Sequence, residues 1–299
     1  MNSTSLLVLT PAKVNLILRV LERRPDGFHA IWSLMHTVGL NDELMLTMQP
    51  AAASRITLRC NQADLAVDQT NLVYRAAELV LARANRTMDL SISLTKRIPM
   101  GAGLGGGSSD AAATILGLNR LLELNWSVEQ MAEVGQQLGS DVPFFFVAPA
   151  ACVTGRGEHV RPVQVTGNRW IVLVSPGFPV PTKWAYQQLA ATRAGVRPLS
   201  AAVQSLDQRS ELDWSEIVPL VENDFEEPVF AHHPVLAQIK CQLLSLGAEV
   251  ALLSGSGATM FGLFRDPSAA QLAADTCGSN PGMTAYAVPA AGAPTTTLV

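Results

Sequence analysis

Hydrophobic residues recur at two different spacings along this chain, and each spacing predicts a different element. Alternating apolar and polar positions, or a short apolar run between turn residues, are typical of a strand, whereas an apolar repeat every three to four positions is typical of a helix. In the first half of the chain the strand pattern covers residues 6–9, 13–20, 44–48, 55–60 and 90–94. The helical pattern there covers residues 72–84, 108–124 and 127–138.

The second half of the chain continues this mixture of strands and helices. Further elements are expected as strands on either side of GRGEHV (155–160), a strand in RWIVLVSP (169–176), helices near 184–194 and 234–246, and two strands, EVALLS and TMFGLF, joined by a glycine turn at 254–257. The mixed order predicts an α+β fold.

The strand in RWIVLVSP is expected to open a second domain. We therefore predict an N-terminal domain at residues 1–166 and a C-terminal domain at residues 167–290. The remaining residues, 291–299, are small and polar, and they are expected to form a disordered tail.

Composition and charge narrow the class of protein. Hydrophobic residues make up 48% of the 299 positions, which is enough for the cores of two ordinary domains. The formal net charge of −4 gives no basic footprint for nucleic acid, while a local cluster can still bind an anionic small molecule. We expect small-molecule partners and no nucleic acid, and the sequence leaves the oligomeric state open.

Cysteine usage and the apolar runs indicate the compartment. The four cysteines are scattered without a CxxC pair, and no histidine has metal-ligand spacing, so neither a disulfide framework nor a protein metal site is indicated. The longest apolar run, residues 142–153, is shorter than the roughly 18 residues that a membrane span needs. The first residues also lack the basic region of a targeting signal. A cytoplasmic protein without membrane contact is expected.

The most unusual stretch is PMGAGLGGGSSDAAAT, residues 99–114, with five glycines between positions 101 and 107. Successive glycines allow backbone N–H groups to converge, and a helix that begins directly after them adds unpaired amides and a positive dipole end. Ser108 or Ser109 is suited to the N-cap of that helix, and Asp110 to its first turn. The stretch therefore predicts a phosphate-binding loop.

Alternative structures for this glycine-rich stretch fit its residues less well. A flexible surface loop does not explain the capped helix that follows. A Walker A loop needs a lysine after its last glycine, and a protein-kinase loop lies between strands. Gly101, Gly103 and Gly106 do satisfy the dinucleotide pattern GxGxxG, but Pro99 interrupts the approach and Glu123 falls inside a helical pattern instead of ending a strand.

Residues 99–112 resemble the phosphate loop of the GHMP kinases, the family of galactokinase, homoserine kinase and mevalonate kinase, which has the form PxGxGLGSSAA. The resemblance implies a two-domain α+β kinase with its active site in the cleft between the domains, ATP as cosubstrate and Mg²⁺ arriving with it. The residues that it assigns to ATP are Lys96, Pro99, Met100, Gly101, Ala102, Gly103, Leu104, Gly105, Gly106, Gly107, Ser108 and Ser109. Ser108 is the side chain expected nearest the metal.

Four further stretches are similar to one branch of this family. They are PAKVNL (11–16), RPDGFH (24–29), LGSDVPFF (138–145) and LSGSGATMF (253–261). Members of that branch use ATP to phosphorylate the carbon-2 hydroxyl of a cytidine-diphosphate-linked methylerythritol in the non-mevalonate isoprenoid pathway. The branch usually has tyrosine where this chain has Phe28, so a hydrogen bond from that ring is absent here.

The resemblance also implies roles for individual residues. Asp141 is assigned as the base that deprotonates the acceptor hydroxyl, with Lys13 beside it as the second catalytic residue. Substrate contacts are assigned to Asn15, Phe28, His29, Thr182 and Tyr186, of which His29 and Tyr186 are expected to recognise the cytosine base.

The pattern alone allows simpler interpretations of the same residues. Lys13 and Asn15 share one face of a strand, which can be its solvent face, and Asp141 before Pro143 can be a helix N-cap. Tyr186 can be a helix core residue, and the 254–257 turn can be only a hairpin connection.

Three other functions remain open at this point. A GHMP kinase acting on homoserine or mevalonate would share the loop but not the cytidine contacts. A dinucleotide-dependent oxidoreductase would use the glycines alone. A noncatalytic RNA-binding module would need the basic face that the net charge argues against.

Overall fold

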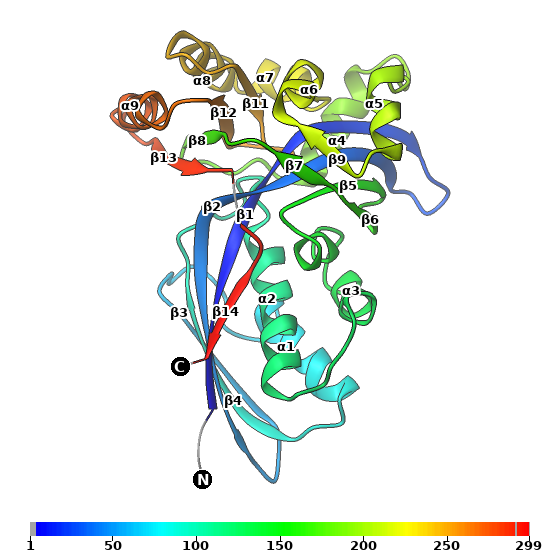
Figure 1. The fold of residues 1–299 in the computed structure, drawn as a ribbon, viewed down its shortest axis with the longest axis vertical. Coiled ribbons are helices and arrows are strands. Elements are labelled where there is room, and N and C mark those ends of the chain that lie inside the picture. The colour runs from blue at the N-terminus through cyan, green and yellow to red at the C-terminus, as the bar shows by residue number, and fades with distance from the viewer. Residues whose placement is uncertain (1–3, 291, 299) are drawn as a thin grey trace.

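The computed structural model describes residues 4–290 and 292–298, which form two lobes (Figure 1). The strands are β1 (Thr4–Arg23), β2 (His29–Pro50), β3 (Arg55–Cys60), β4 (Met88–Thr95), β5 (Ala150–Gly155), β6 (His159–Pro162), β7 (Gln164–Thr166), β8 (Trp170–Ser175), β9 (Glu211–Asp213), β10 (Glu222–Asn223), β11 (Val250–Leu253), β12 (Met260–Phe264), β13 (Thr284–Pro289) and β14 (Thr295–Leu298). The α-helices are α1 (Leu72–Arg83), α2 (Gly106–Leu121), α3 (Val128–Gln136), α4 (Thr182–Thr192), α5 (Ala201–Ser205), α6 (Trp214–Ile217), α7 (Glu226–His232), α8 (Pro234–Ser245) and α9 (Pro267–Gly278). Three 3₁₀ turns are η1 (Pro143–Phe146), η2 (Leu206–Gln208) and η3 (Val218–Leu220).

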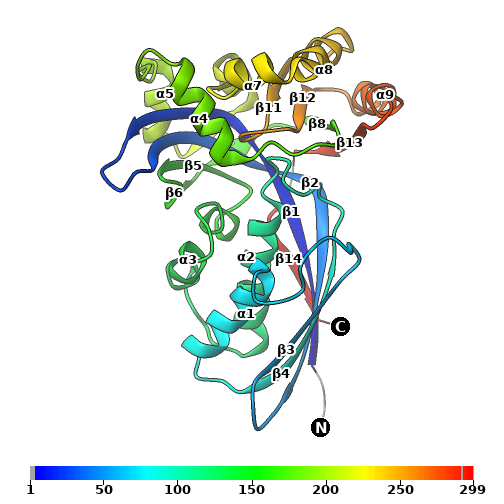
Figure 2. The same cartoon turned by 180° about the vertical axis from the view of Figure 1, so that it is seen from behind.

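The N-terminal lobe is built on a sheet of order β10-β1-β2-β4-β3, with β14 paired to β1 and β5 to β2. Its two longest strands, β1 and β2, form an antiparallel pair that runs from this lobe up into the other one (Figure 1). Helices α1, α2 and α3 cover one face of the sheet, and both views place them on the same side (Figure 2). A core of apolar residues from these helices and strands holds the layers together.

The C-terminal lobe has a four-stranded antiparallel sheet of order β11-β12-β8-β13, against which α4, α7, α8 and α9 pack. A further apolar cluster joins the lobes, because Ala12 and Leu34 of the long pair share it with Leu173 and Phe261 of the C-terminal sheet. The α+β class and the two-domain architecture predicted from the sequence are confirmed.

Several element predictions need correction. Residues 6–9 and 13–20 belong to one strand, β1, and residues 44–48 are the end of a strand that begins at His29. Thr10, between the two predicted strands, is fully buried and hydrogen-bonded, and the pairing register with β2 shifts between Pro11 and Ala12.

The prediction of a disordered tail is also wrong for residues 295–298. Residues 295–298 form β14, whose register pairs Leu6 with Leu298 and Leu9 with Thr295. Three threonines in a row favour extended backbone, and the edge of β1 supplies the partner groups. Residues 291 and 299 of the predicted tail lie outside the described residues. Since β10 and β14 both add to the N-terminal sheet, the C-terminal half also completes the N-terminal lobe.

Candidate active site

The glycine loop between β4 and α2 has a backbone that only glycine adopts without strain at three positions. Gly101, Gly103 and Gly105 have φ values of +62°, +79° and +70°. A Cβ on Gly103 would lie 2.0 Å from the carbonyl oxygen of Ser254, and a Cβ on Gly105 would lie 2.9 Å from Lys13 Cγ. The glycines therefore serve both the turn and the close approach of neighbouring groups.

Helix α2 begins at Gly106, with Gly105 at its N-cap in the left-handed region. The predicted caps Ser108 and Ser109 are wrong, and Asp110 lies beyond the first turn, because the glycines themselves carry the chain into the helix. Within the described part of the chain no side chain caps this helix, so its first amides are available to an anion. Ser108 is half-buried, while the hydroxyl of Ser109 is fully buried and has no hydrogen-bond partner among the described residues.

Lys13 lies below the loop and meets Asp141. Its ammonium is 3.7 Å from the Asp141 carboxylate and donates a 2.7 Å hydrogen bond to Asn15 Oδ1. Asn15 in turn donates to the hydroxyl of Ser33 at 2.8 Å, and both residues of the strand are buried. Burial lowers the pKa of Lys13, and the negative charge of Asp141 opposes that shift. The solvent-face interpretation of Lys13 and Asn15 is therefore wrong.

Asp141 precedes η1, which has Val142 and not Asp141 at its N-cap. The carboxylate is 31% exposed, so it faces both Lys13 and the open side of the site. A carboxylate that lies beside a lysine ammonium and is reachable from outside has the geometry of a general base.

The turn at residues 254–257 joins β11 to β12 and also packs on the glycine loop. The Ser254 hydroxyl donates to the carbonyl of Gly103 at 3.0 Å, and the N–H of Thr259 donates to the carbonyl of Ala102 at 3.2 Å. From the other side, the N–H of Lys13 donates to the carbonyl of Leu104 at 2.9 Å. The loop is thus held between β1 and the C-terminal lobe, and the turn is more than a hairpin connection.

Of the predicted substrate residues, His29 and Tyr186 are in contact with each other, whereas Asn15 lies beside Lys13 in the middle of β1. The rings of His29 and Tyr186 stack with centroids 5.3 Å apart, and the ring of Phe225 meets Tyr186 edge-on at 4.9 Å. Phe28 is exposed and lies under the Arg156 guanidinium, 4.9 Å from its ring centroid. The Thr182 hydroxyl is 3.0 Å from that of Ser256, which brings α4 to the glycine turn.

Burial and nearby charges shift the pKa values of His29 and Tyr186. Burial lowers the pKa of His29, and the positive charges of Arg193 and Arg23 lower it further. The imidazole is therefore neutral near pH 7, with one nitrogen that donates and one that accepts. Burial raises the pKa of Tyr186 to about 12, with a smaller effect from the charge of Asp141.

Lys96 lies beneath the loop and not on its open face. Its ammonium is ion-paired with Asp42 and, at 2.7 Å, with Asp110, and all three side chains are buried. Thr10 donates a further hydrogen bond of 2.7 Å to Asp110. Asp42 was missed from the sequence, although it alternates with Leu40, Leu44 and Leu46 on the buried face of β2. Of the other loop residues, Met100 is exposed, while Ala102 and Leu104 are buried.

Neither a membrane-spanning helix nor a side-chain group for a metal ion is found in the described residues. In residues 4–290 and 292–298, no helix has the length and apolarity to span a bilayer. In the same residues, no three histidine, cysteine, aspartate or glutamate side chains are grouped so that they can hold a metal ion.

Family comparisons agree with this geometry. Residues 71–148 match the model of the GHMP kinases N terminal domain, and residues 202–281 match that of the GHMP kinases C terminal domain. The fold and the site therefore define a GHMP kinase. A solved homoserine kinase from Cytophaga hutchinsonii, 21% identical with a TM-score of 0.73, covers 99% of this chain and 97% of its own, and it shares the fold.

More similar proteins narrow the assignment. The 4-diphosphocytidyl-2-C-methyl-D-erythritol kinase of Syntrophotalea carbinolica is 41% identical over 280 residues, 94% of this chain and 97% of its own. That of Bacillus thuringiensis strain Al Hakam is 40% identical over 90% of both chains. A solved 4-(cytidine 5'-diphospho)-2C-methyl-D-erythritol kinase is 33% identical with a TM-score of 0.75, covering 95% of this chain and 98% of its own. This chain belongs to the 4-diphosphocytidyl-2-C-methyl-D-erythritol kinase family.

Proposed function

We propose that this chain transfers the γ-phosphoryl group of ATP to the 2-hydroxyl of 4-diphosphocytidyl-2-C-methyl-D-erythritol, a step of the non-mevalonate isoprenoid pathway. The observation that carries the proposal is the Lys13–Asp141 pair, 3.7 Å apart, next to a glycine loop that leads into helix α2 without a side-chain cap. Family membership supports the kinase activity and the substrate, and it argues against the oxidoreductase and RNA-binding alternatives.

The glycine loop and the first turn of α2 bind the phosphates of ATP. Backbone amides and the helix dipole stabilise negative charge without the desolvation cost of a side chain. Lys96 supports this surface from below, since both of its carboxylate partners are buried there. The direct ATP contact that the family resemblance implies for Lys96 thus becomes a supporting role.

Asp141 accepts the proton of the acceptor hydroxyl, and the Lys13 ammonium lies 3.7 Å from its carboxylate. The Lys13 ammonium also faces the loop, where it offsets charge that develops on the transferring phosphoryl group. Because the transition state of phosphoryl transfer is loose, positioning and charge stabilisation supply most of the rate. Asn15 fixes the ammonium through its 2.7 Å hydrogen bond.

Mg²⁺ is expected to enter with ATP. Magnesium sites of this kind take few protein ligands and are completed by substrate phosphates and water. The half-buried hydroxyl of Ser108, in the first turn of α2, fits such a site. The metal would neutralise charge on the phosphates.

His29 and Tyr186 form the cytosine end of the site, with Phe28 and Thr182 beside them. A neutral imidazole hydrogen-bonds the base edge, and an aromatic ring stacks on its face. Both substrates are small molecules, and we place the enzyme in the cytoplasm.

The direct test is release of ADP, measured with a coupling enzyme, over a panel of alcohols. The cytidine-linked methylerythritol should support turnover, whereas homoserine and mevalonate should not. Turnover on homoserine or mevalonate alone would assign the chain to another GHMP activity. Absence of ATP consumption with every alcohol would contradict a kinase.

A further inference from the structure

A short segment of the C-terminal half reaches three parts of the site at once. Strand β10 pairs in parallel with β1, aligning Glu222 with Ile17 and Asn223 with Leu18. The chain then continues through Asp224 and Phe225 into α7. Asn223, Asp224 and Phe225 each contact a different part of the site, and no sequence motif marks them.

Asn223 holds the glycine turn. Its amide donates to the carbonyl of Leu253 at 2.7 Å and to that of Gly255 at 2.8 Å, and its own oxygen accepts from the N–H of Phe225. The side chain is only 7% exposed, so water cannot readily replace these bonds. Both amide hydrogens and the amide oxygen are used, and the start of the turn is fixed to β10.

The glycine turn that Asn223 holds is also hydrogen-bonded to the phosphate loop. Ser254, between the two residues that Asn223 binds, donates to the carbonyl of Gly103 at 3.0 Å. A Cβ on Gly255 would lie 3.5 Å from the Lys13 ammonium nitrogen. A displacement of the turn would therefore shift the phosphate loop or change the packing around the Lys13 ammonium.

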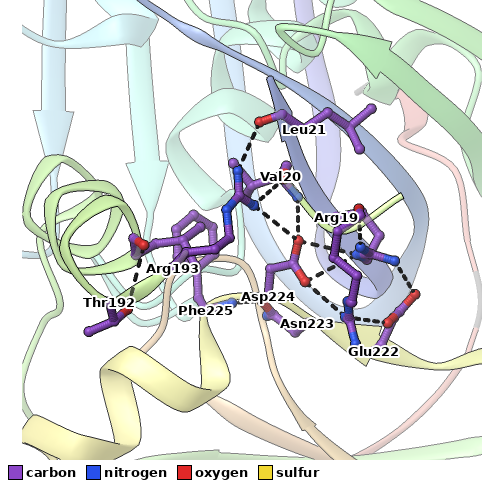
Figure 3. A network of polar contacts seen from close by, with 11 residues as sticks. Arg19, Val20, Leu21, Thr192, Arg193, Glu222, Asn223, Asp224 and Phe225 are labelled. Carbon is purple, nitrogen blue, oxygen red and sulfur yellow. Dashed lines mark hydrogen bonds and ion pairs between the residues drawn. The ribbon is translucent and has the colours of Figure 1, made fainter. Parts of the chain in front are cut away.

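Asp224 contacts the end of β1 that leads to Phe28 and His29. Its carboxylate accepts hydrogen bonds from Arg19 Nε at 3.1 Å and from the N–H of Val20 at 2.8 Å (Figure 3). Arg197 donates to it at 3.0 Å. Arg193, one residue beyond α4, donates to the carbonyls of Val20 and Leu21 (Figure 3). The end of β1 that leads to Phe28 and the end of α4 are thus clamped together.

Phe225 completes the connection on the aromatic side. Its buried ring lies edge-on to Tyr186 with centroids 4.9 Å apart, and Tyr186 stacks on His29. Edge-to-face packing of this kind fixes the orientation of the second ring.

We propose that Asn223, Asp224 and Phe225 are positioning residues that set the two ends of the site separately. Asn223 places the glycine turn against the phosphate loop and Lys13, whereas Asp224 and Phe225 place His29 and Tyr186. The inference rests on the proposed function for the identity of the second ligand. It predicts that neighbouring substitutions affect different substrates, which a general loss of stability would not produce.

The test is steady-state kinetics of the full chain with ATP and the cytidine-linked substrate varied in turn. Asn223→Ala leaves two buried carbonyls unpaired, and it should lower kcat and raise KM for ATP by roughly tenfold to a hundredfold, the range for a misplaced reacting group. Asp224→Asn and Phe225→Leu should raise KM for the cytidine-linked substrate by a similar factor. Because Asn223 also accepts a hydrogen bond from the N–H of Phe225, the other KM should change too, but clearly less than the first.

Glu222→Gln is the matched control for Asp224→Asn, since it makes the same carboxylate-to-amide change two residues away and also faces Arg19. Should Asn223→Ala or Asp224→Asn fail to fold, Asn223→Ser retains one hydroxyl donor and Phe225→Leu retains every charge. Equal changes in both KM values, or changes no larger than those of Glu222→Gln, would overturn the proposal.

Failure of the proposed function is a separate result. The parent would then show no turnover on the cytidine-linked substrate. Calorimetry with ATP, and with cytidine diphosphate as the second probe, would still compare Asn223→Ala with Asp224→Asn. An affinity loss for ATP in the first and for cytidine diphosphate in the second supports the positioning roles, and equal losses overturn them.

Discussion

The ammonium of Lys13 lies 3.7 Å from the carboxylate of Asp141, although Lys13 is on the first strand and Asp141 follows the third helix. The lysine is buried, whereas the aspartate is 31% exposed. Burying the cation costs free energy, and the anion beside it offsets part of that cost. The exposed side of Asp141 is left free to meet an acceptor hydroxyl.

Asp141→Asn should therefore reduce kcat without preventing folding. The amide keeps the size of the side chain but cannot accept a proton, and loss of a general base typically lowers turnover by about 10² to 10⁴. The chain should still fold, but its melting temperature should fall, because the buried Lys13 ammonium loses the anion that offsets its burial. ADP release and thermal unfolding measure the two effects, and turnover near that of the parent would exclude Asp141 as the base.

Two glycines of the same loop should respond differently to alanine. Gly105 has a φ of +70°, and a Cβ there would lie 2.9 Å from Lys13 Cγ, so Gly105→Ala should lower both ATP affinity and the melting temperature. In Gly107→Ala the nearest atom is 3.6 Å away and the position is helical, so the melting temperature should stay equal or rise. Thermal unfolding with ATP calorimetry makes the comparison. Equal melting temperatures would show that the loop backbone is not strained by a side chain at Gly105.

The buried cluster under the loop should make stability depend on pH. Burial, together with the nearby charge of Asp42, raises the pKa of Asp110 to about 6 from 3.8, although Lys96 opposes the shift. The folded state thus binds this proton more tightly than the unfolded state. The stabilising contribution is complete below pH 3.8 and is lost as the pH rises through about 6.

Asp110→Asn removes this titration while keeping an acceptor for Thr10. The free energy of unfolding of the parent minus that of the variant should therefore fall as the pH rises from about 4 to about 6 and then stay level. Urea denaturation at several pH values measures the difference. A difference that is constant over this range would show that Asp110 is ionised throughout, with Lys96 as the dominant influence.

Local patterns predicted the elements with strong contrast between apolar and polar faces. The strand at residues 55–60 has the predicted bounds, and α1 ends one residue before the prediction. Helix α9 was missed because small residues, Ala270, Ala273, Ala274 and Cys277, form its buried face, so its hydrophobic contrast is weak. Strand β14 was missed because its order comes from the edge of β1, which the tail sequence does not contain.

The same distinction applies to the site. Lys13, Asp141 and the glycine loop were predicted as site residues because each lies in a continuous stretch that resembles a family motif. Asp42 and Asn223 act through contacts with distant parts of the chain, to Lys96 in one case and to Leu253 and Gly255 in the other. Such contacts follow from the pairing of β10 with β1 and of β2 with β4, which no local pattern specifies.

Selection of cytosine over uracil would distinguish this chain from GHMP kinases that act on homoserine or mevalonate. The His29 and Tyr186 rings stack 5.3 Å apart at an interplanar angle of 19°, so a base can add to this stack. Cytosine has an exocyclic amine donor where uracil has an acceptor. Reversing one buried hydrogen bond leaves like groups facing each other, which costs about 1 to 3 kcal/mol.

The uridine-linked analogue should therefore have a much lower kcat/KM than the cytidine-linked substrate. Tyr186→Ala should raise KM for the cytidine-linked substrate and spare ATP, because stacking on one base contributes about 1 to 3 kcal/mol. Tyr186→Phe is the matched control, since it keeps the ring and removes only a hydroxyl whose raised pKa, about 12, keeps it neutral. Competition between the two analogues and the KM values of both variants give the answer. Equal use of the analogues, or a defect in Tyr186→Ala confined to ATP, would exclude a cytidine pocket at these residues.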